Sequence, residues 1–147
     1  MRHHASYKAA PGGRPASAKA GWPVPLAIKP AATIPKLFAD LALARGDGRH
    51  ARIMRTLTGA QLLILDDWGL DPLDAGARRD LYEILEERYG RRSTILTSQV
   101  PVDKWHEVIG NPTYADAILD RLVHNAHRID LVGDSLRRTR PRPTAKD

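Results

Sequence analysis

The sequence contains no cysteine and no long apolar run. The absence of cysteine excludes a disulfide scaffold, a thiolate zinc site and a cysteine nucleophile. No apolar stretch approaches the ~20 residues needed to cross a bilayer, which excludes a membrane-spanning helix. The first residues also lack the apolar segment of a secretory signal, and we therefore expect a cytoplasmic protein. The 147 residues, 42% hydrophobic and 27% charged, correspond to about one soluble domain.

Acidic residues are absent from residues 1–39, which hold six Lys and Arg residues. Residues 137–147 hold five basic residues against one acid, whereas residues 40–136 hold twelve basic residues against sixteen acids. The formal net charge of +6 therefore comes from the two ends, and the middle of the chain is acidic. This distribution indicates flexible basic arms, which can contact nucleic-acid phosphates without sequence preference.

The first part of the chain has few features of a folded segment. Residues 1–35 contain six of the eleven prolines and show no apolar periodicity. Such a composition is typical of a segment that cannot bury enough apolar surface to fold. We therefore expect residues 1–33 to be disordered, and residues 139–147 to form a basic tail.

From Pro35 onward, helix and strand patterns alternate. Apolar spacing and capping residues predict helices from Pro35 to Gly46, over residues 50–57, from Asp74 to Gly90, over 102–109 and over 113–124. Continuous apolar runs predict strands over residues 61–66, 93–97 and 127–132. Buried-type strands that alternate with helices are typical of an open parallel sheet, so the predicted fold class is α/β.

Two adjacent carboxylates, Asp66 and Asp67, follow the apolar residues 62–65. The carboxyl end of a strand is where ligands bind in open α/β sheets. There Asp66 could hold Mg²⁺ and Asp67 could polarise an attacking water, which is the Walker B arrangement of nucleotide hydrolases. The alternative is an ordinary buried strand with an acidic exit, because such patterns also arise by chance.

Thr97, Ser98 and Gln99 end the next predicted strand at the same edge of the sheet. They are candidates to sense a terminal phosphate or to position water, and the alternative is an ordinary strand exit. Arg121 lies in an amphipathic helical segment. It is either a surface salt-bridge residue or a finger that reaches a nucleotide on a neighbouring copy.

The phosphate-binding half of such a site is missing from the sequence. A Walker B acid acts on phosphates that are held by a glycine-rich loop ending in Lys followed by Ser or Thr. The motif G-x-x-x-x-G-K-[ST] occurs nowhere in the 147 residues, and the glycine-containing residues 12–21 have no Lys followed by Ser or Thr. We therefore expect no measurable ATP turnover by this chain.

These segments together resemble the IstB-type ATPases, the helper proteins of a class of insertion sequences within the AAA+ group. The resemblance runs from Ile34 to about Arg138 and rests on PKLFADLALARGDGR, LLILDDWGLDPLDAGARRDLYEILEERYG, RRSTILTSQVPVDKW and NPTYADAILDRLVHNAHRIDLVGDSLRR. It implies roles for the residues at matching positions: Asp66 and Asp67 as Walker B acids, Thr97, Ser98 and Gln99 as sensor 1, Arg121 as arginine finger and Arg137 as a second sensor.

The resemblance also implies cofactors, partners and a fold. ATP and Mg²⁺ would be the cofactors, and DNA, a transposase and further copies of the helper would be the partners. The fold would be a partial P-loop NTPase of three layers over residues 34–138, without its first strand and phosphate loop. In the family that strand lies between those expected here at 93–97 and 127–132, so its loss would leave a gap in the sheet and a weakened core.

The Pro- and Ala-rich stretch stands where the family carries its Walker A loop. A shifted reading of the codons from Arg14 permits PTGVGKSWLACALG, which contains a phosphate-binding motif. We therefore expect residues 1–33 to be out of frame, with the family frame recovered near Thr33. The nucleotide sequence tests this hypothesis, which is abandoned if the neighbouring frame encodes no such loop.

The resemblance supports one main interpretation and two alternatives. The main interpretation is an inactive remnant of a transposition helper, whose family role is ATP-dependent DNA binding and transposase recruitment. The first alternative is a non-enzymatic DNA-binding or regulatory fragment that joins full-length helpers through the face around Arg121. The second is a replicative helicase loader of the DnaC type, which the genomic neighbours would distinguish.

Overall fold

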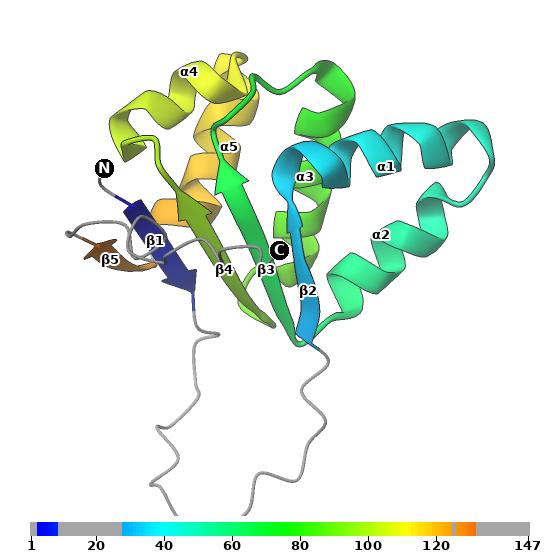
Figure 1. The fold of residues 1–147 in the computed structure, drawn as a ribbon, viewed down its shortest axis with the longest axis horizontal. Coiled ribbons are helices and arrows are strands. Elements are labelled where there is room, and N and C mark those ends of the chain that lie inside the picture. The colour runs from blue at the N-terminus through cyan, green and yellow to red at the C-terminus, as the bar shows by residue number, and fades with distance from the viewer. Residues whose placement is uncertain (1–2, 9–27, 125, 132–147) are drawn as a thin grey trace, which may run out of the picture.

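The computed structural model describes residues 3–8, 28–124 and 126–131, which form a sheet and a layer of helices (Figure 1). The strands are β1 (His3–Lys8), β2 (Ile28–Thr33), β3 (Leu62–Trp68), β4 (Ser93–Ser98) and β5 (His127–Leu131). The helices are α1 (Ile34–Gly46), α2 (His50–Gly59), α3 (Ala75–Arg88), α4 (Trp105–Ile109) and α5 (Pro112–Val123), with a short 3₁₀ helix at Val102–Lys104. None of the helices in these residues is long and apolar enough to cross a bilayer.

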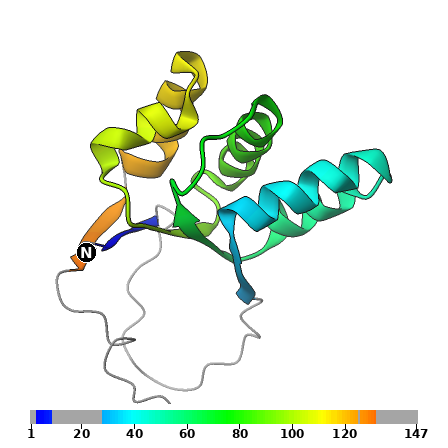
Figure 2. The same cartoon turned by 45° about the horizontal axis from the view of Figure 1, so that its top comes forward.

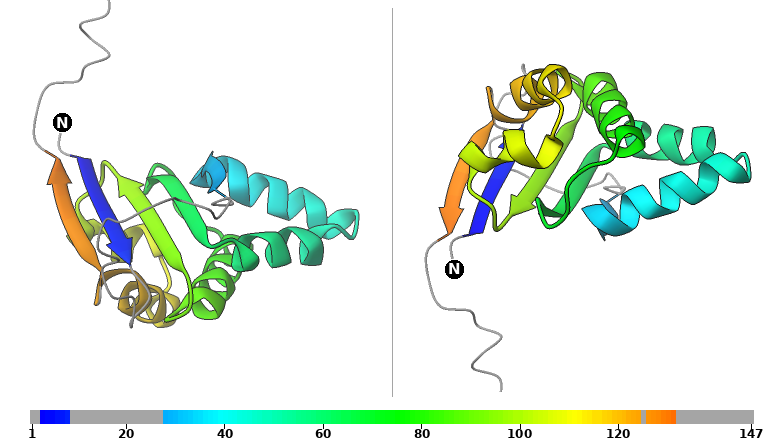
Figure 3. Two further views of the ribbon diagram at one scale, coloured as in Figure 1. Left: turned by 90° about the horizontal axis from the view of Figure 1, so that it is seen from below. Right: turned by 90° about the horizontal axis from the view of Figure 1, so that it is seen from above.

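The five strands form one sheet in the order β2-β3-β4-β1-β5 (Figure 3). β2, β3 and β4 run parallel to one another, and β1 runs antiparallel to both β4 and β5. β5 is therefore parallel to β4, and among the described strands only β1 is reversed. The last residues of β3, β4 and β5 lie at one edge of the sheet, which we call the carboxyl edge. The opposite edge, where these strands begin, is the amino edge.

The described helices pack against one face of the sheet (Figure 2). Side chains alternate along β3 and β4, and Leu63, Leu65 and Leu96 are buried on the helix side. They belong to a single apolar core, to which α1, α3 and α5 each contribute buried leucine or isoleucine side chains. Burying one such side chain stabilises the fold by about 1.5–3 kcal/mol, so the apolar stripe of each helix determines which way it faces.

The sequence correctly predicts the helices and three of the strands. Asp74 caps α3, because its carboxylate accepts a hydrogen bond from the Ala77 amide at 2.7 Å. Asn111 caps α5 with its side-chain oxygen. Pro35 lies in the first turn of α1, where a helix leaves the backbone N–H unpaired in any case. The predicted α/β class with a partial P-loop fold is confirmed.

Two strands lie in the segment 1–33, for which the sequence predicts disorder. That prediction is corrected for β1 and β2, whereas residues 9–27 and the predicted basic tail 139–147 lie outside the described residues. β1 fills the position between β4 and β5 that was expected to be empty, and it runs antiparallel to both of these strands. Main-chain pairing explains the difference, because the backbone groups of β4 and β5 gain partners whatever side chains the inserted strand carries.

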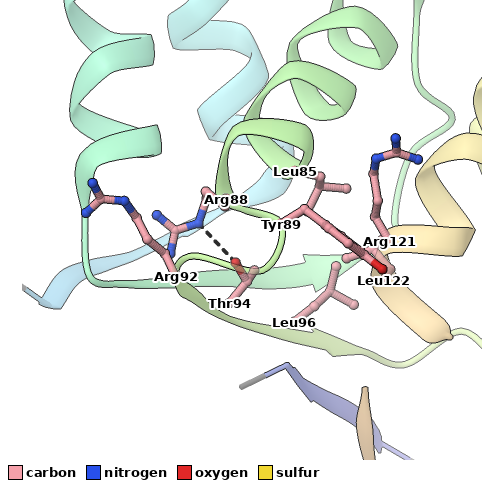
Figure 4. Close-up of a pocket in the computed structure, with 8 residues that line it drawn as sticks. All are labelled: Leu85, Arg88, Tyr89, Arg92, Thr94, Leu96, Arg121 and Leu122. Atoms are coloured by element: carbon pink, nitrogen blue, oxygen red, sulfur yellow. Dashed lines mark hydrogen bonds between the residues drawn. The ribbon is translucent and has the colours of Figure 1, made fainter. Parts of the chain in front are cut away.

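At the amino edge, the buried side chain of Arg88 is hydrogen bonded to several segments, and Figure 4 shows its bond to Thr94. Arg88, near the end of α3, is only 2% exposed. It donates hydrogen bonds to five neutral acceptors, which are the carbonyls of Leu57, Thr58, Ala60 and Ser93 and the hydroxyl of Thr94. Burial, followed by repulsion from Arg92, lowers the pKa of Arg88 to about 10, so the guanidinium stays protonated at neutral pH. It thereby satisfies a carbonyl in the last turn of α2 that the helix itself leaves unpaired.

Candidate functional site

β3 ends in a bulge that the two adjacent acids form. The register between β3 and β4 shifts between Leu65 and Trp68, so Asp66 and Asp67 together lie opposite one residue, Thr97. Asp67 adopts a left-handed φ of 60°, which is uncommon for a residue other than glycine. Because the bulge adds one residue to the alternation, Leu65 and Trp68 both lie on the buried side, and Trp68 is fully buried.

Thr97 closes the bulge by contacting both acids. Its hydroxyl donates a hydrogen bond to the Asp66 carboxylate and accepts one from the Asp67 backbone N–H at 3.3 Å. The structure therefore brings Asp66, Asp67 and Thr97 together at the carboxyl edge, as the sequence predicts. It also gives the two acids different surroundings, since Asp66 is bonded to β4 whereas Asp67 lines a cavity beside α1.

The cavity beside Asp67 has a volume of about 270 Å³. Its apolar wall includes Phe38 of α1 and Leu70 of the loop that follows β3. Asp67, Asp71 and Asp74 also line it, and no described lysine or arginine does. The volume is close to the lower limit of ordinary ligand pockets, but the carboxylates make the cavity unfavourable for phosphate groups.

Ser98 and Gly69 allow the segments at the ends of β4 and β3 to lie in close contact. The Ser98 hydroxyl, which is buried, donates to the Trp68 carbonyl at 2.8 Å and accepts from the Val100 N–H at 3.0 Å. Gly69 has a φ of 89°, and a Cβ at this position would lie only 2.9 Å from a methyl carbon of Val100. Ser98 therefore has a backbone-bridging role that the sequence does not predict, and Gln99 beside it is exposed.

Arg121 lies on α5, away from the acids of the carboxyl edge. Its guanidinium is hydrogen bonded to Glu86 of α3 and lies 5.1 Å from the centre of the Tyr82 ring. The hydrogen bond to Glu86 is the largest cause of a raised pKa for Arg121. Residue 86 is about 18 Å along the axis of α3 from Asp74, which lines the cavity. Within one copy, Arg121 is thus not part of the acidic site, and Arg137 lies outside the described residues.

The described residues do not fit a magnesium-bound nucleotide. In P-loop proteins the phosphate loop follows a strand at the edge where the Walker B acids lie. Here the last residue of β1, Lys8, pairs with Thr94 near the beginning of β4, so the chain leaves β1 at the amino edge. β2 begins at that same edge, where Ile28 pairs with Leu62. Among residues 3–8, 28–124 and 126–131, no three His, Cys, Asp or Glu side chains are grouped to hold a metal ion.

The pattern of one protein family matches most of the sequence. This family is described as IstB-like ATP binding protein, and the match covers residues 30–144. The chain belongs to this IstB-like family. The predicted resemblance to IstB-type ATPases is thereby confirmed. The matched range includes β3, β4 and β5, whereas β1 lies before it.

Insertion-sequence proteins match the same region of this IstB-like chain. A putative insertion sequence ATP-binding protein of Sinorhizobium fredii, y4pL, is 76% identical over 109 residues, which are 74% of this chain and 44% of that protein. Another from the same organism, y4uH, is 59% identical over 107 residues, or 73% of this chain and 43% of that protein. The IS21 putative ATP-binding protein of Pseudomonas aeruginosa is 35% identical over 102 residues, or 69% and 38%. The chain thus spans less than half the length of these relatives.

The IstB-like domain also carries exposed arginines on one surface, although acids outnumber basic residues in its middle part, residues 40–136. Arg49, Arg52 and Arg55 are exposed and recur every third residue, so they share one stripe, which we call the α2 stripe. α2 itself contains no acid, although Arg49 is paired with Asp47 in the preceding turn at 2.5 Å. Arg92 is hydrogen bonded to the last residue of the same helix. The signal in the sequence is the spacing of three, which the sixteen acids of residues 40–136 obscure in any count of charge.

Proposed function

We propose that this IstB-like chain is an insertion-sequence helper that retains the acidic half of the nucleotide site and does not turn over ATP. One observation carries the proposal. The reversed β1 occupies the position between β4 and β5, and the chain leaves it at the amino edge, opposite Asp66 and Asp67. A phosphate loop that followed this strand would lie at the wrong edge of the sheet for the two acids, and a parallel strand has no room while β1 is present.

The charge of the cavity supports the same proposal. Three carboxylates line it without a described basic side chain to offset them. A carboxylate contributes to triphosphate binding only through a bound cation, while backbone amides and a lysine must hold the phosphates at the same time. No described lysine lines the cavity, so a Mg²⁺ ion at Asp67 would have no basic side chain beside it to hold the phosphates.

Nucleotide titration tests this proposal. With a fluorescent ATP analogue, the purified chain should show no magnesium-dependent binding with a Kd below about 1 mM, the value that corresponds to about 4 kcal/mol. ATP hydrolysis should be the same for the chain and for Asp67→Asn, which removes a carboxylate but tolerates the left-handed backbone. Tight magnesium-dependent binding, or hydrolysis that Asp67→Asn abolishes, contradicts the proposal.

We propose further that the chain binds DNA and a transposase and that it is located in the cytoplasm. The α2 stripe supports a contact with DNA, because exposed arginines along one helix can pair with successive phosphates. Such contacts carry no sequence information and weaken as the salt concentration rises. We therefore expect DNA binding that needs no ATP.

The DNA contact is tested by fluorescence polarisation with a labelled duplex over a series of salt concentrations. Arg55→Glu should weaken binding and lower the slope of log K against log salt by about 1. Arg79→Glu is the matched control, because Arg79 is exposed on α3 and the change of charge is the same. Equal effects of both variants, or no binding at low salt, would count against the α2 stripe.

Association with a complete helper through the face around Arg121 is the remaining part of the proposal. Arg121 is bonded to Glu86 in the same copy, so this pair must open before the guanidinium can reach a neighbour's nucleotide. Co-purification of the chain with a tagged complete helper tests the association. It should be reduced by Arg121→Ala and unchanged by Arg79→Ala, and retention by both variants would exclude this face.

A further inference from the structure

The slot between β4 and β5 is bounded by two strands that run in the same direction (Figure 3). β1 lies in this slot, antiparallel to both walls, with five register pairs to β4 and five to β5. The slot therefore has the width of one strand, and main-chain donors and acceptors form its walls. Both walls lie within the range that matches the IstB-like family, whereas the strand that fills the slot precedes that range.

β5 is joined to the sheet through the strand in the slot. In the described residues its one strand partner is β1. All five of its side chains are exposed, and Ile129 and Leu131 are each 52% exposed, so β5 contributes nothing to the described core. Its pairing with β1 uses main-chain hydrogen bonds, which an extended peptide of almost any sequence can make.

The connection between β1 and the rest of the chain is long. Nineteen residues separate Lys8 from Ile28, and both ends of this connection are at the amino edge. A chain of that length reaches up to about 63–68 Å, several times the width of the sheet. By length alone, the strand in the slot can therefore be supplied by the same copy or by another copy of the chain.

We propose that the slot between β4 and β5 is a binding site for an extended peptide strand, and that its occupant, His3–Lys8, exchanges between copies of this chain. A slot without a strand has unpaired N–H and C=O groups on both walls, which is a surface that recruits another strand. The His3–Lys8 strand of a second copy matches these walls in register. Because the exchanged pair makes the same hydrogen bonds as the single chain, exchange depends on the concentration of chain and requires no new contact.

The absence of cysteine allows a disulfide test in the whole chain. Ala5 of β1 and Ile129 of β5 are register partners, and directly opposite residues have the Cα separation that a disulfide needs. The double variant Ala5→Cys/Ile129→Cys should therefore form an intramolecular disulfide under mild oxidation. In the control Ala5→Cys/Asp130→Cys, the second position is one residue out of register and on the opposite face of β5, so the disulfide should be lost.

Exchange is measured by mixing the single variants Ala5→Cys and Ile129→Cys, one of them isotopically labelled. Because the strand of another copy competes with the strand of the same copy, more slots should be filled from another copy as the chain concentration rises. Mass spectrometry should find a disulfide between position 5 of one variant and position 129 of the other. Its yield should fall in proportion when the mixture is diluted before oxidation.

Two results would overturn the proposal. If the Ala5→Cys/Ile129→Cys double variant forms no more disulfide than the Asp130→Cys control, β1 does not occupy the slot in this register. If the double variant forms its disulfide but the mixed single variants form no more than a mixture of Ala5→Cys with Asp130→Cys, the strand binds in its own slot without exchange. Both results are independent of nucleotide binding, so they leave the proposed function unaffected.

Discussion

The two edges of the sheet are built in opposite ways. At the amino edge, the buried Arg88 satisfies carbonyl groups of several segments and is shielded from water. At the carboxyl edge, Asp66 and Asp67 stay half-buried in a bulge, and one hydroxyl, that of Thr97, serves both. The buried guanidinium of Arg88, which is bonded to neutral acceptors, contributes to stability, whereas the half-buried Asp66 and Asp67 beside a cavity are available to bind a ligand. Substitutions should therefore cost much more stability at the amino edge than at the carboxyl edge.

The largest effect is expected for Arg88→Met. Methionine fills part of the volume but donates no hydrogen bond, so buried carbonyls lose their partners at about 1–3 kcal/mol each. We expect the free energy of unfolding, measured by urea denaturation, to fall by about 3–5 kcal/mol. Arg79→Met, at an exposed position of the same helix, should change it by less than about 0.5 kcal/mol. Similar losses for both variants would contradict the role of Arg88 at the amino edge.

A smaller loss is expected for Ser98→Ala at the end of β4. The substitution removes the hydroxyl that bridges the Trp68 carbonyl and the Val100 N–H, and both groups lie in a part-buried or buried setting. We expect a loss of about 1–3 kcal/mol in the free energy of unfolding. Ser93→Ala, at the other end of the same strand, is the control, because the described contact of Ser93 to Arg88 uses its carbonyl. A Ser98→Ala variant as stable as that control would show that the bridge is dispensable.

Thr97→Val tests the closure of the bulge, with an expected cost of about 1 kcal/mol. Valine has the shape of threonine but cannot accept from the Asp67 N–H or donate to Asp66. Hydrogen exchange at the Asp67 amide should become faster, which urea denaturation alone would not reveal. Thr97→Ser keeps the hydroxyl and should preserve the protection of this amide. If valine and serine protect it equally, the hydroxyl does not close the bulge.

The smallest change is expected for Asp67→Gly. Glycine adopts the left-handed φ of 60° without strain, so the free energy of unfolding should stay within about 0.5 kcal/mol of the original. Asp67→Ala should be less stable than Asp67→Gly by about 1 kcal/mol, because its Cβ disfavours this backbone conformation. Thermal and urea denaturation of the two variants side by side provide the measurement. A glycine variant less stable than the alanine variant would mean that the carboxylate itself stabilises the fold.

The elements that could be predicted from the sequence are those defined by local signals. The cap at Asp74 and the apolar runs of β3 and β4 are each contained in a few consecutive residues. β1 and β2 could not be predicted, because β1 pairs with residues about ninety or more positions away and its pairing is through the main chain. β2 contains Pro30 and is an outermost strand of the sheet, a position where a missing backbone N–H is tolerated.

The candidate site was predictable to the same extent. The adjacency of Asp66 and Asp67 after an apolar strand is local, and so is their position at the carboxyl edge. The bulge depends on the register between β3 and β4, which the sequence of neither strand specifies alone. The sequence assigns Ser98 to phosphate sensing, whereas its buried hydroxyl is engaged with the backbone. The roles of Thr97 and Gln99 at a nucleotide stay predictions.

The bulge at the end of β3 means that this part of the gene should respond differently to the loss and to the gain of one codon. Either acid can be exchanged for a residue of similar backbone preference while Trp68 keeps its place among the helices. Loss of a single codon at position 66 or 67 would remove the extra residue of the bulge and restore strict alternation, with the indole still on the buried side, two residues after Leu65. Insertion of one triplet between these two codons would instead add a second extra residue before Trp68, and we expect it to destabilise the fold more than the deletion does.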